Sequence, residues 1–196
     1  MRYIILTGGI ASGKSSVSSM LLENGINVVD ADKIAHEILD EKRSEITNAF
    51  GCEFVKDGKV DRKKLGELIF KDKNQREILE HILHKKIYEK IEKAATRLER
   101  QKKFFVVDIP LFFEKDGVYG SAFTVVVYAP KEEQIARLMR RNKLTKEEAC
   151  LRVSAQLDIE QKRAKADVVI DNSKDLAHLK KEVEKFIAIL KERYVS

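Results

Sequence analysis

The sequence predicts an α/β fold of three layers, in which helices cover both faces of a five-stranded parallel sheet. Short apolar runs rich in β-branched and aromatic residues alternate with longer helical patterns, which is the order of a doubly wound sheet. Each run is almost continuously apolar, as in strands that are buried on both faces. The first run also leads directly into a glycine-rich segment with the pattern of a phosphate-binding loop.

The predicted strands occupy five stretches, residues 2–7, 26–30, 104–109, 123–128 and 167–171. Helical patterns separate or follow them at residues 15–23, 32–101, 131–165 and 174–193. Parallel neighbours require right-handed crossover connections. The second connection is far longer than one crossover helix needs, so it predicts an inserted helical subdomain. Within it we expect a turn at residues 56–59, a helix capped by Asp61 and a long helix over residues 74–101.

The length and composition of the chain indicate one hydrophobic core with smaller inserted segments. The chain has 196 residues, 43% of them hydrophobic and 36% charged, with a formal net charge of +6. Such a balance suits anionic ligands, nucleic acid or a solvated surface. Basic residues are interleaved with acidic ones and no aromatic stacking series is present, so we expect no nucleic-acid partner. Cys52 and Cys150 have no metal-ligand spacing. The sequence shows no leader and no apolar run of membrane length, so we expect a cytoplasmic protein that does not contact membranes.

The glycine-rich segment at residues 8–15 reads Gly-Gly-Ile-Ala-Ser-Gly-Lys-Ser and matches G-x-x-x-x-G-K-[ST] between a strand and a helix. Its glycines let the backbone direct several N–H groups at one phosphate chain, and the helix adds its positive end. Lys14 is expected to reach the outer phosphates, and Ser15 to offer its hydroxyl to Mg²⁺. The alternative is a plain glycine-serine turn. The residues expected to bind a nucleoside triphosphate are Gly8, Gly9, Ile10, Ala11, Ser12, Gly13, Lys14, Ser15 and Ser16.

Acidic side chains follow two predicted strands, at the edge of the sheet where ligands bind. Asp30 and Asp32 follow the second strand, and one of them is expected to orient an attacking hydroxyl and accept its proton. Alternatively, Asp32 only caps the next helix, although Ala35 stands where a full capping box has Glu or Gln. His36 lies on the same helix face as Asp32. Asp108 ends the third strand, and either joins the Mg²⁺ shell or belongs to a strand-terminal turn.

Arginines at helical spacing end the segment that begins at residue 130: Arg137, Arg140 and Arg141. They either close over the triphosphate and stabilise charge on the transferring group, or form a solvated basic face. Two histidines, His81 and His84, are three residues apart, but no further ligand completes a metal site there. The segment 142–145 lacks the Asp of a guanine-reading motif, which argues against a GTP switch.

Taken in order, these segments resemble the dephospho-coenzyme A kinase family over nearly the whole chain. The matching stretches are residues 6–15, 30–36, 79–84, 108–114, 141–145 and 170–173, with Ala149, Arg152, Gln156, Lys162, Ala166 and Asp167. Asp-Ala-Asp followed by Ala-His, together with Pro-Leu-x-x-Glu, is more particular to this family than the phosphate loop. The chain departs from the family at Lys85, where Pro is frequent, and Asp108 is not a fixed family feature.

The resemblance implies a P-loop kinase fold like that of the nucleoside monophosphate kinases, with a helical substrate-binding insertion and a small helical lid. The corresponding boundaries are residues 1–32, 102–136 and 156–196 for the nucleotide-binding core, 33–101 for the insertion and 137–155 for the lid. The implied reaction transfers the γ-phosphoryl group of ATP to the ribose 3'-hydroxyl of 3'-dephospho-coenzyme A, the last step of coenzyme A synthesis.

The same resemblance implies roles for individual residues. Asp32 would be the catalytic carboxylate, assisted by Lys14, Arg137 and Arg141, and Asn172 would lie near the adenine. Further contacts are expected from Arg140 to the nucleotide and from His36, His84, Pro110 and Leu111, beside Asp32, to the acceptor. We expect a monomer or weak homo-oligomer. The alternatives are a kinase of another small acceptor, such as a nucleoside monophosphate, and a nucleotide-dependent binding module without catalysis.

Overall fold

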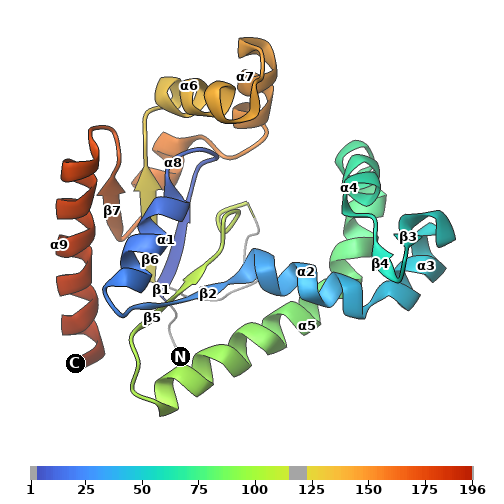
Figure 1. Cartoon of the computed structure of the whole chain (residues 1–196), viewed down its shortest axis with the longest axis horizontal. Coiled ribbons are helices and arrows are strands. Elements are labelled where there is room, and N and C mark those ends of the chain that lie inside the picture. Colours follow the sequence, from blue (N-terminus) through green and yellow to red (C-terminus); the bar gives the residue numbers. More distant parts are fainter. Residues whose placement is uncertain (1–3, 115–122, 196) are drawn as a thin grey trace. The chain divides into compact units, whose positions relative to one another are not determined.

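The computed structural model describes residues 4–114 and 123–195 (Figure 1). The chain divides into two compact units: Met1–Val29 with Leu98–Ser196, which we call the sheet unit, and Asp30–Arg97, which we call the helical unit. The sequence predicted a helical insertion at residues 33–101 and a lid at residues 137–155. In the structure, residues 137–155 belong to the sheet unit. The lid as a separate domain stays a prediction.

A five-stranded parallel sheet in the order β2-β5-β1-β6-β7 forms the centre of the sheet unit. Its strands are β1 (Ile4–Gly8), β2 (Asn27–Asp30), β5 (Phe105–Asp108), β6 (Phe123–Tyr128) and β7 (Val168–Asp171). Ile5 is in register with Val107 of β5 and with Thr124 of β6. The predicted fold class and strands are confirmed, except that residues 2 and 3 of the first predicted strand lie outside the described residues.

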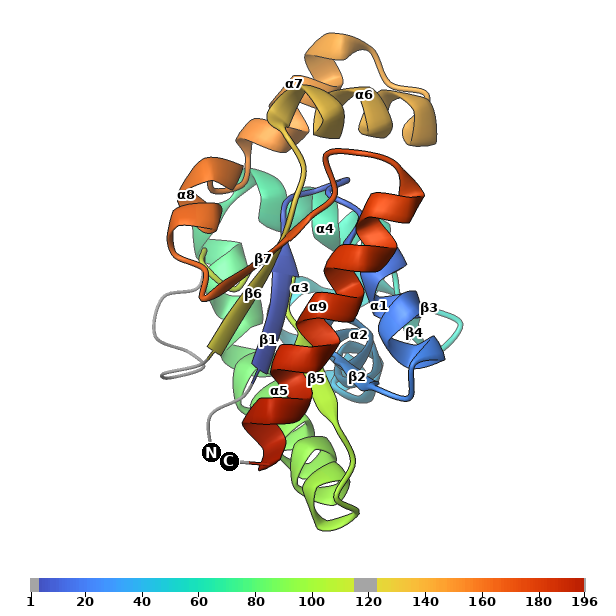
Figure 2. The ribbon, with the colours of Figure 1, turned by 90° about the vertical axis from the view of Figure 1, so that its left-hand side faces the viewer.

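Burial of both faces explains why the central strands are almost continuously apolar. Helices α1 (Lys14–Glu23) and α9 (Leu176–Val195) cover one face (Figure 2). Their apolar side chains pack with alternate strand residues in one cluster that includes Ile4, Leu6, Val17, Leu21, Val125, Val127, Val183, Phe186 and Leu190. Ile5 and Val126 alternate with the strand members of this cluster and are also fully buried. Neither side of the central strands is left to solvent, as parallel sheets require.

Three helices connect β6 to β7: α6 (Lys131–Asn142), α7 (Lys146–Ser154) and α8 (Ile159–Ala164). The sequence predicted one helical region at residues 131–165. Lys143 ends α6 in the left-handed conformation, with a φ of 53°. A capping box then starts α7, because Thr145 and Glu148 each bond the backbone N–H of the other. These local signals divide the region into separate helices.

The helical unit has a hydrophobic core of its own. It contains α2 (Ala31–Glu41), α3 (Arg43–Phe50), η1 (Cys52–Phe54), β3 (Val55–Lys56), β4 (Lys59–Val60), α4 (Arg62–Lys71) and most of α5 (Lys73–Arg100). The core includes Ile38, Leu39, Ile46, Phe54, Val60, Leu65, Leu79 and Leu83. Asp61 caps α4 as predicted, since its side chain accepts a hydrogen bond from the Lys64 N–H at 3.0 Å. The turn predicted at residues 56–59 is the tip of the β3-β4 hairpin, where Asp57 and Gly58 both have positive φ.

No helix within residues 4–114 and 123–195 combines the length and the apolar character that a membrane span requires.

Candidate nucleotide and acceptor site

The loop between β1 and α1 has the backbone of an anion-binding nest. Ala11 and Gly13 have φ values of 58° and 97°, and such reversals of handedness turn successive N–H groups toward one side of a chain. Among the described residues, five N–H groups of the loop have no hydrogen-bond acceptor: those of Gly9, Ala11, Gly13, Lys14 and Ser15. The last two open α1, so the positive end of its dipole adds to the same donors.

Other backbone N–H groups of the loop already donate hydrogen bonds to acceptors within the protein. The Ile10 N–H donates to Oε1 of Gln156 at 2.8 Å, and the Ser12 N–H donates to the Gly9 carbonyl at 3.1 Å. Ile10 therefore offers no free N–H, and its predicted part in nucleotide binding stays a prediction. Some N–H groups of the loop therefore stabilise its conformation, and the others are available to a ligand.

Close packing explains why glycine occupies two loop positions. A Cβ on Gly13 would lie 2.0 Å from Nδ2 of Asn172, in addition to the cost of the positive φ. A Cβ on Gly9 would lie 2.4 Å from Oε1 of Gln134, a buried side chain that donates to the Ala129 carbonyl. The loop thus lies directly against side chains of α6 and of the segment after β7.

Two residues predicted to contact the nucleotide bond to the backbone of Ser12. Asn172 donates to the Ser12 carbonyl at 2.8 Å, and Arg137 donates to the same oxygen at 3.5 Å. Arg137 also donates to the Asn172 carbonyl at 2.9 Å and pairs with Glu133 at 3.3 Å. The structure therefore brings Arg137 and Asn172 to the phosphate loop, while their contacts with a nucleotide stay predictions.

The segment that carries Asn172 begins with a hydrogen-bonded carboxylate. Asp171 accepts hydrogen bonds from the Ser173 N–H at 3.0 Å and from the His178 ring at 3.1 Å. Partial burial raises the pKa of Asp171, but the hydrogen bonds from Ser173 and His178 outweigh it and hold the pKa below its usual value. The ionised carboxylate thereby stabilises the turn between β7 and α9.

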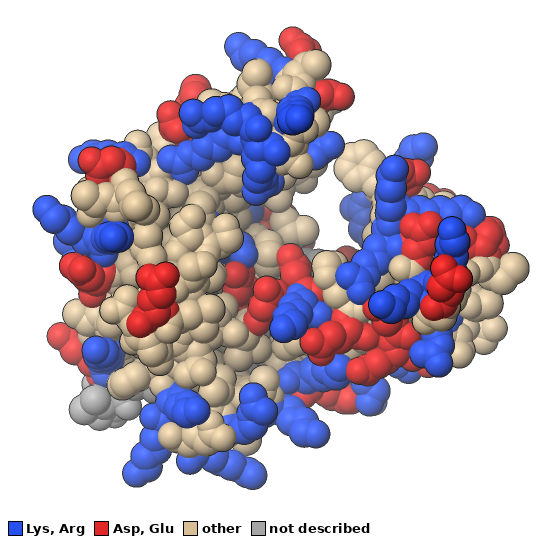
Figure 3. Space-filling view, viewed as in Figure 1, with Lys and Arg blue, Asp and Glu red and all other residues tan. Residues whose placement is uncertain are grey.

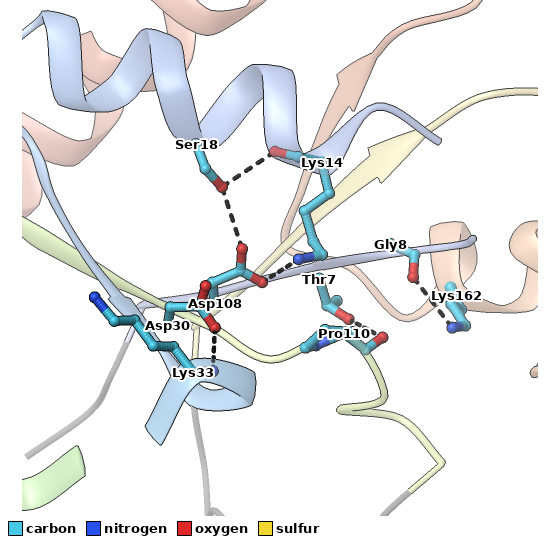
Figure 4. Close-up of polar contacts among 9 residues, drawn as sticks. All are labelled: Thr7, Gly8, Lys14, Ser18, Asp30, Lys33, Asp108, Pro110 and Lys162. Carbon is cyan, nitrogen blue, oxygen red and sulfur yellow. Dashed lines mark hydrogen bonds and ion pairs between the residues drawn. The ribbon is translucent and has the colours of Figure 1, made fainter. Parts of the chain in front are cut away.

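Lys14 forms an ion pair with Asp108, and Ser18 donates to the second carboxylate oxygen of Asp108 at 3.2 Å (Figure 4). The Asp108 side chain is only 7% exposed, at the end of the strand next to β1. Its carboxylate and the Ser15 hydroxyl are hard oxygen ligands of the kind that Mg²⁺ prefers. This donor set fits the predicted metal role, which no contact of the structure tests. No group of three or more His, Cys, Asp or Glu within the described residues is arranged to hold a metal ion.

The remaining predicted arginines, Arg140 and Arg141, are exposed on α6. Arg141 donates to the side chain of its neighbour Asn142 at 2.9 Å. Basic side chains gather over α6 and α7 (Figure 3), where the exposed members include Lys131, Arg140, Arg141, Lys143, Lys146 and Arg152. This arrangement is compatible with both alternatives stated for these residues, a lid over the triphosphate and a solvated basic face.

Pro110 and Leu111 follow β5 in the sheet unit. The Pro110 carbonyl accepts a hydrogen bond from the Thr7 hydroxyl at 3.0 Å (Figure 4), and Leu111 is 38% exposed. Pro110 is therefore fixed beside the strand that leads into the phosphate loop, and the exposed Leu111 is available to a ligand.

The predicted catalytic carboxylate lies in the first turn of α2, in the helical unit. Asp30 caps this helix, because its side chain accepts a hydrogen bond from the Lys33 N–H at 2.9 Å (Figure 4). The alternative that Asp32 caps the helix is wrong, since the cap lies two residues earlier. The Asp32 side chain is exposed and makes no hydrogen bond or ion pair with another described residue. His36 is exposed on the same helix and His84 is half-buried on α5, and their contact with an acceptor stays a prediction.

Several residues around the loop were given no role by the sequence. Gln156 and Ser18 bond the loop or its partners, Gln134 packs against Gly9, and Lys162 and Glu114 form an ion pair at 2.6 Å. Gln156, Lys162 and Glu114 do lie in segments that match the family, which was the available signal. Their contacts join parts of the chain that are distant in sequence, so local patterns do not reveal them.

Comparison with known proteins identifies the family of the chain. Residues 2–178 match the family model described as dephospho-CoA kinase. A dephospho-CoA kinase from Sulfurimonas denitrificans is 46% identical over 192 residues, which cover 98% of this chain and 96% of the relative. The solved structure of dephospho-CoA kinase from Campylobacter jejuni is 38% identical, with a TM-score of 0.74, and the match covers 98% of this chain and all of that one. The structure of TT1252 from Thermus thermophilus is 34% identical, with a TM-score of 0.83, over 96% of this chain and 98% of that one. The chain belongs to the dephospho-CoA kinase family.

Proposed function

We propose that this kinase transfers the γ-phosphoryl group of ATP to the ribose 3'-hydroxyl of 3'-dephospho-coenzyme A, giving coenzyme A and ADP. The observation that carries the proposal is the phosphate loop, with its free N–H groups and Lys14 on one segment, in a chain that matches the family over residues 2–178. Family membership favours this acceptor over a nucleoside monophosphate, the alternative acceptor considered from the residues.

In the proposed mechanism, the free N–H groups of the loop and Lys14 bind the outer phosphates of ATP. Asp32 accepts a hydrogen bond from the acceptor hydroxyl and takes its proton as the new O–P bond forms. The bond between the γ-phosphorus and the bridging oxygen breaks, and ADP leaves with its electron pair. Arg137 and Arg141 offset the charge on the transferring group. Mg²⁺, which Ser15 and Asp108 would hold, supplies further neutralisation of the phosphate charge when bound.

The helical unit is proposed to bind the acceptor, with contacts from His36 and His84 and from Pro110 and Leu111 of the sheet unit. Arg140 and Asn172 are proposed to contact the nucleotide, and residues 137–155 to act as a lid that excludes water, which would otherwise compete as acceptor. We further propose a monomer or weak homo-oligomer, located in the cytoplasm and without a nucleic-acid partner. The interleaving of basic with acidic residues supports the last point.

The test is ADP release with 3'-dephospho-coenzyme A, measured beside a panel of nucleoside monophosphates. We expect the coenzyme precursor to be strongly preferred, and phosphorus NMR of the product to place the new phosphate on the 3' oxygen. Lys14→Ala is the control, because it should remove activity with every acceptor. Preference for a nucleotide would refute the proposed acceptor.

A further inference from the structure

We infer that Lys162 is a positioning residue for the phosphate loop, acting through the Gly8 carbonyl and charge-balanced by Glu114. Lys162 lies on α8, and its side chain has no exposed surface. Its ammonium is 2.6 Å from Oε1 of Glu114 and donates to the Gly8 carbonyl oxygen at 3.3 Å (Figure 4 shows the second contact). These two contacts link α8 and the segment after β5 to the first residue of the loop.

A fully buried ammonium is unfavourable unless it is paired and hydrogen-bonded. An apolar side chain of similar length would fill the same space without that cost, so packing alone does not account for a lysine. The contacts of Lys162 point instead to the loop: one partner is the loop's own carbonyl, and the other is the carboxylate that balances the charge.

The geometry of the peptide bond connects this contact to phosphate binding. In a trans peptide the C=O and the next N–H point in opposite directions, and the described residues contain no cis peptide. Holding the Gly8 carbonyl toward Lys162 therefore turns the Gly9 N–H to the opposite side, where it is one of the free donors of the loop. A cation bonded to a carbonyl also polarises the amide, which strengthens its N–H as a donor.

Two further contacts hold other peptide groups of the loop in place. Asn172 holds the Ser12 carbonyl at 2.8 Å, which orients the Gly13 N–H, and Gln156 holds the Ile10 N–H at 2.8 Å. Glu114 connects these anchors, because Oε1 also accepts a hydrogen bond from the N–H of Leu157, next to Gln156, at 3.1 Å. The donors are thus oriented before the phosphates arrive, which lowers the reorganisation needed on binding.

The test compares Lys162→Met, Glu114→Gln, the double variant and Lys165→Met, a control at an exposed lysine that follows the same helix. Each protein is measured for Mg-ADP affinity by calorimetry, for the KM values of ATP and of the acceptor, and for Tm. We expect Lys162→Met to lower Tm, because a buried hydrogen bond to a charged group is lost, and to weaken ADP binding about tenfold, because the Gly9 N–H is no longer oriented beforehand. The KM of the acceptor and all properties of Lys165→Met should stay unchanged.

The double variant separates positioning from simple stabilisation. Removing one member of a buried pair leaves an uncompensated charge, whereas removing both restores stability. We therefore expect the double variant to regain Tm but not ADP affinity. Recovery of both, or normal ADP affinity in a folded Lys162→Met protein, would show that the pair is only structural and overturn the inference. The inference rests on the proposed function only in that the loop binds a nucleotide. Because ADP binding needs no acceptor, a wrong acceptor assignment would leave this result unchanged.

Discussion

Gly13 has a positive φ, and the Asn172 side chain occupies the position of a Cβ, so this glycine gives the sharpest test of the loop at the scale of one residue. In Gly13→Ala, the left-handed backbone costs about 1–2 kcal/mol, and the new methyl group would displace the Asn172 side chain 2.0 Å away. Displacing Asn172 also frees the Ser12 carbonyl and the peptide that it orients. We expect ADP affinity to fall at least about tenfold, because about 1.4 kcal/mol corresponds to that factor, as measured by calorimetry.

Gly66 provides the matched control. It lies inside α4, and nothing within 4 Å would meet a Cβ there. Gly66→Ala should therefore stabilise the protein by about 0.5–1 kcal/mol through the better helix propensity of alanine, with no change in ADP affinity. If Gly13→Ala bound ADP normally, the shape of the loop backbone would not determine phosphate binding.

Asp32 gives the second prediction at this scale, and it separates chemistry from nucleotide binding. Asp32→Asn keeps the size of the side chain but cannot accept the hydroxyl proton in the same way. We expect kcat to fall by about a hundredfold to ten-thousandfold, the usual contribution of a general base, with ADP affinity unchanged. Steady-state kinetics beside calorimetry measure the two effects. Near-normal turnover in the purified variant would refute the assigned role.

At the scale of the element, the cap of α2 controls how firmly Asp32 is held. Asp30→Ala removes the acceptor of the Lys33 N–H, and loss of such a cap costs about 1 kcal/mol. We expect faster amide exchange at Lys33, with reduced kcat because the first turn frays. Asp30→Asn is the control, since its side-chain oxygen still caps the helix. Equal exchange rates in Asp30→Ala and the parent protein would mean that the cap does not hold this turn.

The elements also show what the sequence could and could not predict. The three central strands β1, β5 and β6 were predictable because burial on both faces makes each one a nearly continuous apolar run. The β3-β4 hairpin was predicted only as a turn, because strands of two residues are too short to show alternation. The phosphate loop was predictable because its residues are consecutive. The Lys162 contact with Gly8 was not, since 154 positions separate the two residues and only the fold joins them.

At the scale of the whole molecule, each unit has a carboxylate with a lowered pKa that links its stability to pH. In the sheet unit this is Asp171, described above. In the helical unit it is Asp40, where burial raises the pKa but the Val60 N–H at 3.2 Å and Arg62 at 2.8 Å outweigh it. In both cases the unfolded chain binds the proton more tightly than the folded protein. Stability is therefore fully present above the usual pKa of an aspartate, about 4, and is lost as the pH falls through the lower pKa of the folded state.

We therefore expect Asp40→Asn and Asp171→Asn each to lower the free energy of unfolding at pH 7 and to flatten its decrease between about pH 5 and pH 2. Urea unfolding at several pH values measures this, and amide exchange assigns the change to the helical or the sheet unit. Asp57→Asn is the control, because Asp57 is exposed in the hairpin turn and asparagine tolerates its φ of 50°. An unchanged pH dependence in both test variants would show that these carboxylates do not link stability to pH. The helical unit should respond to Asp40→Asn and the sheet unit to Asp171→Asn, because each carboxylate bonds only within its own unit in the contacts given above.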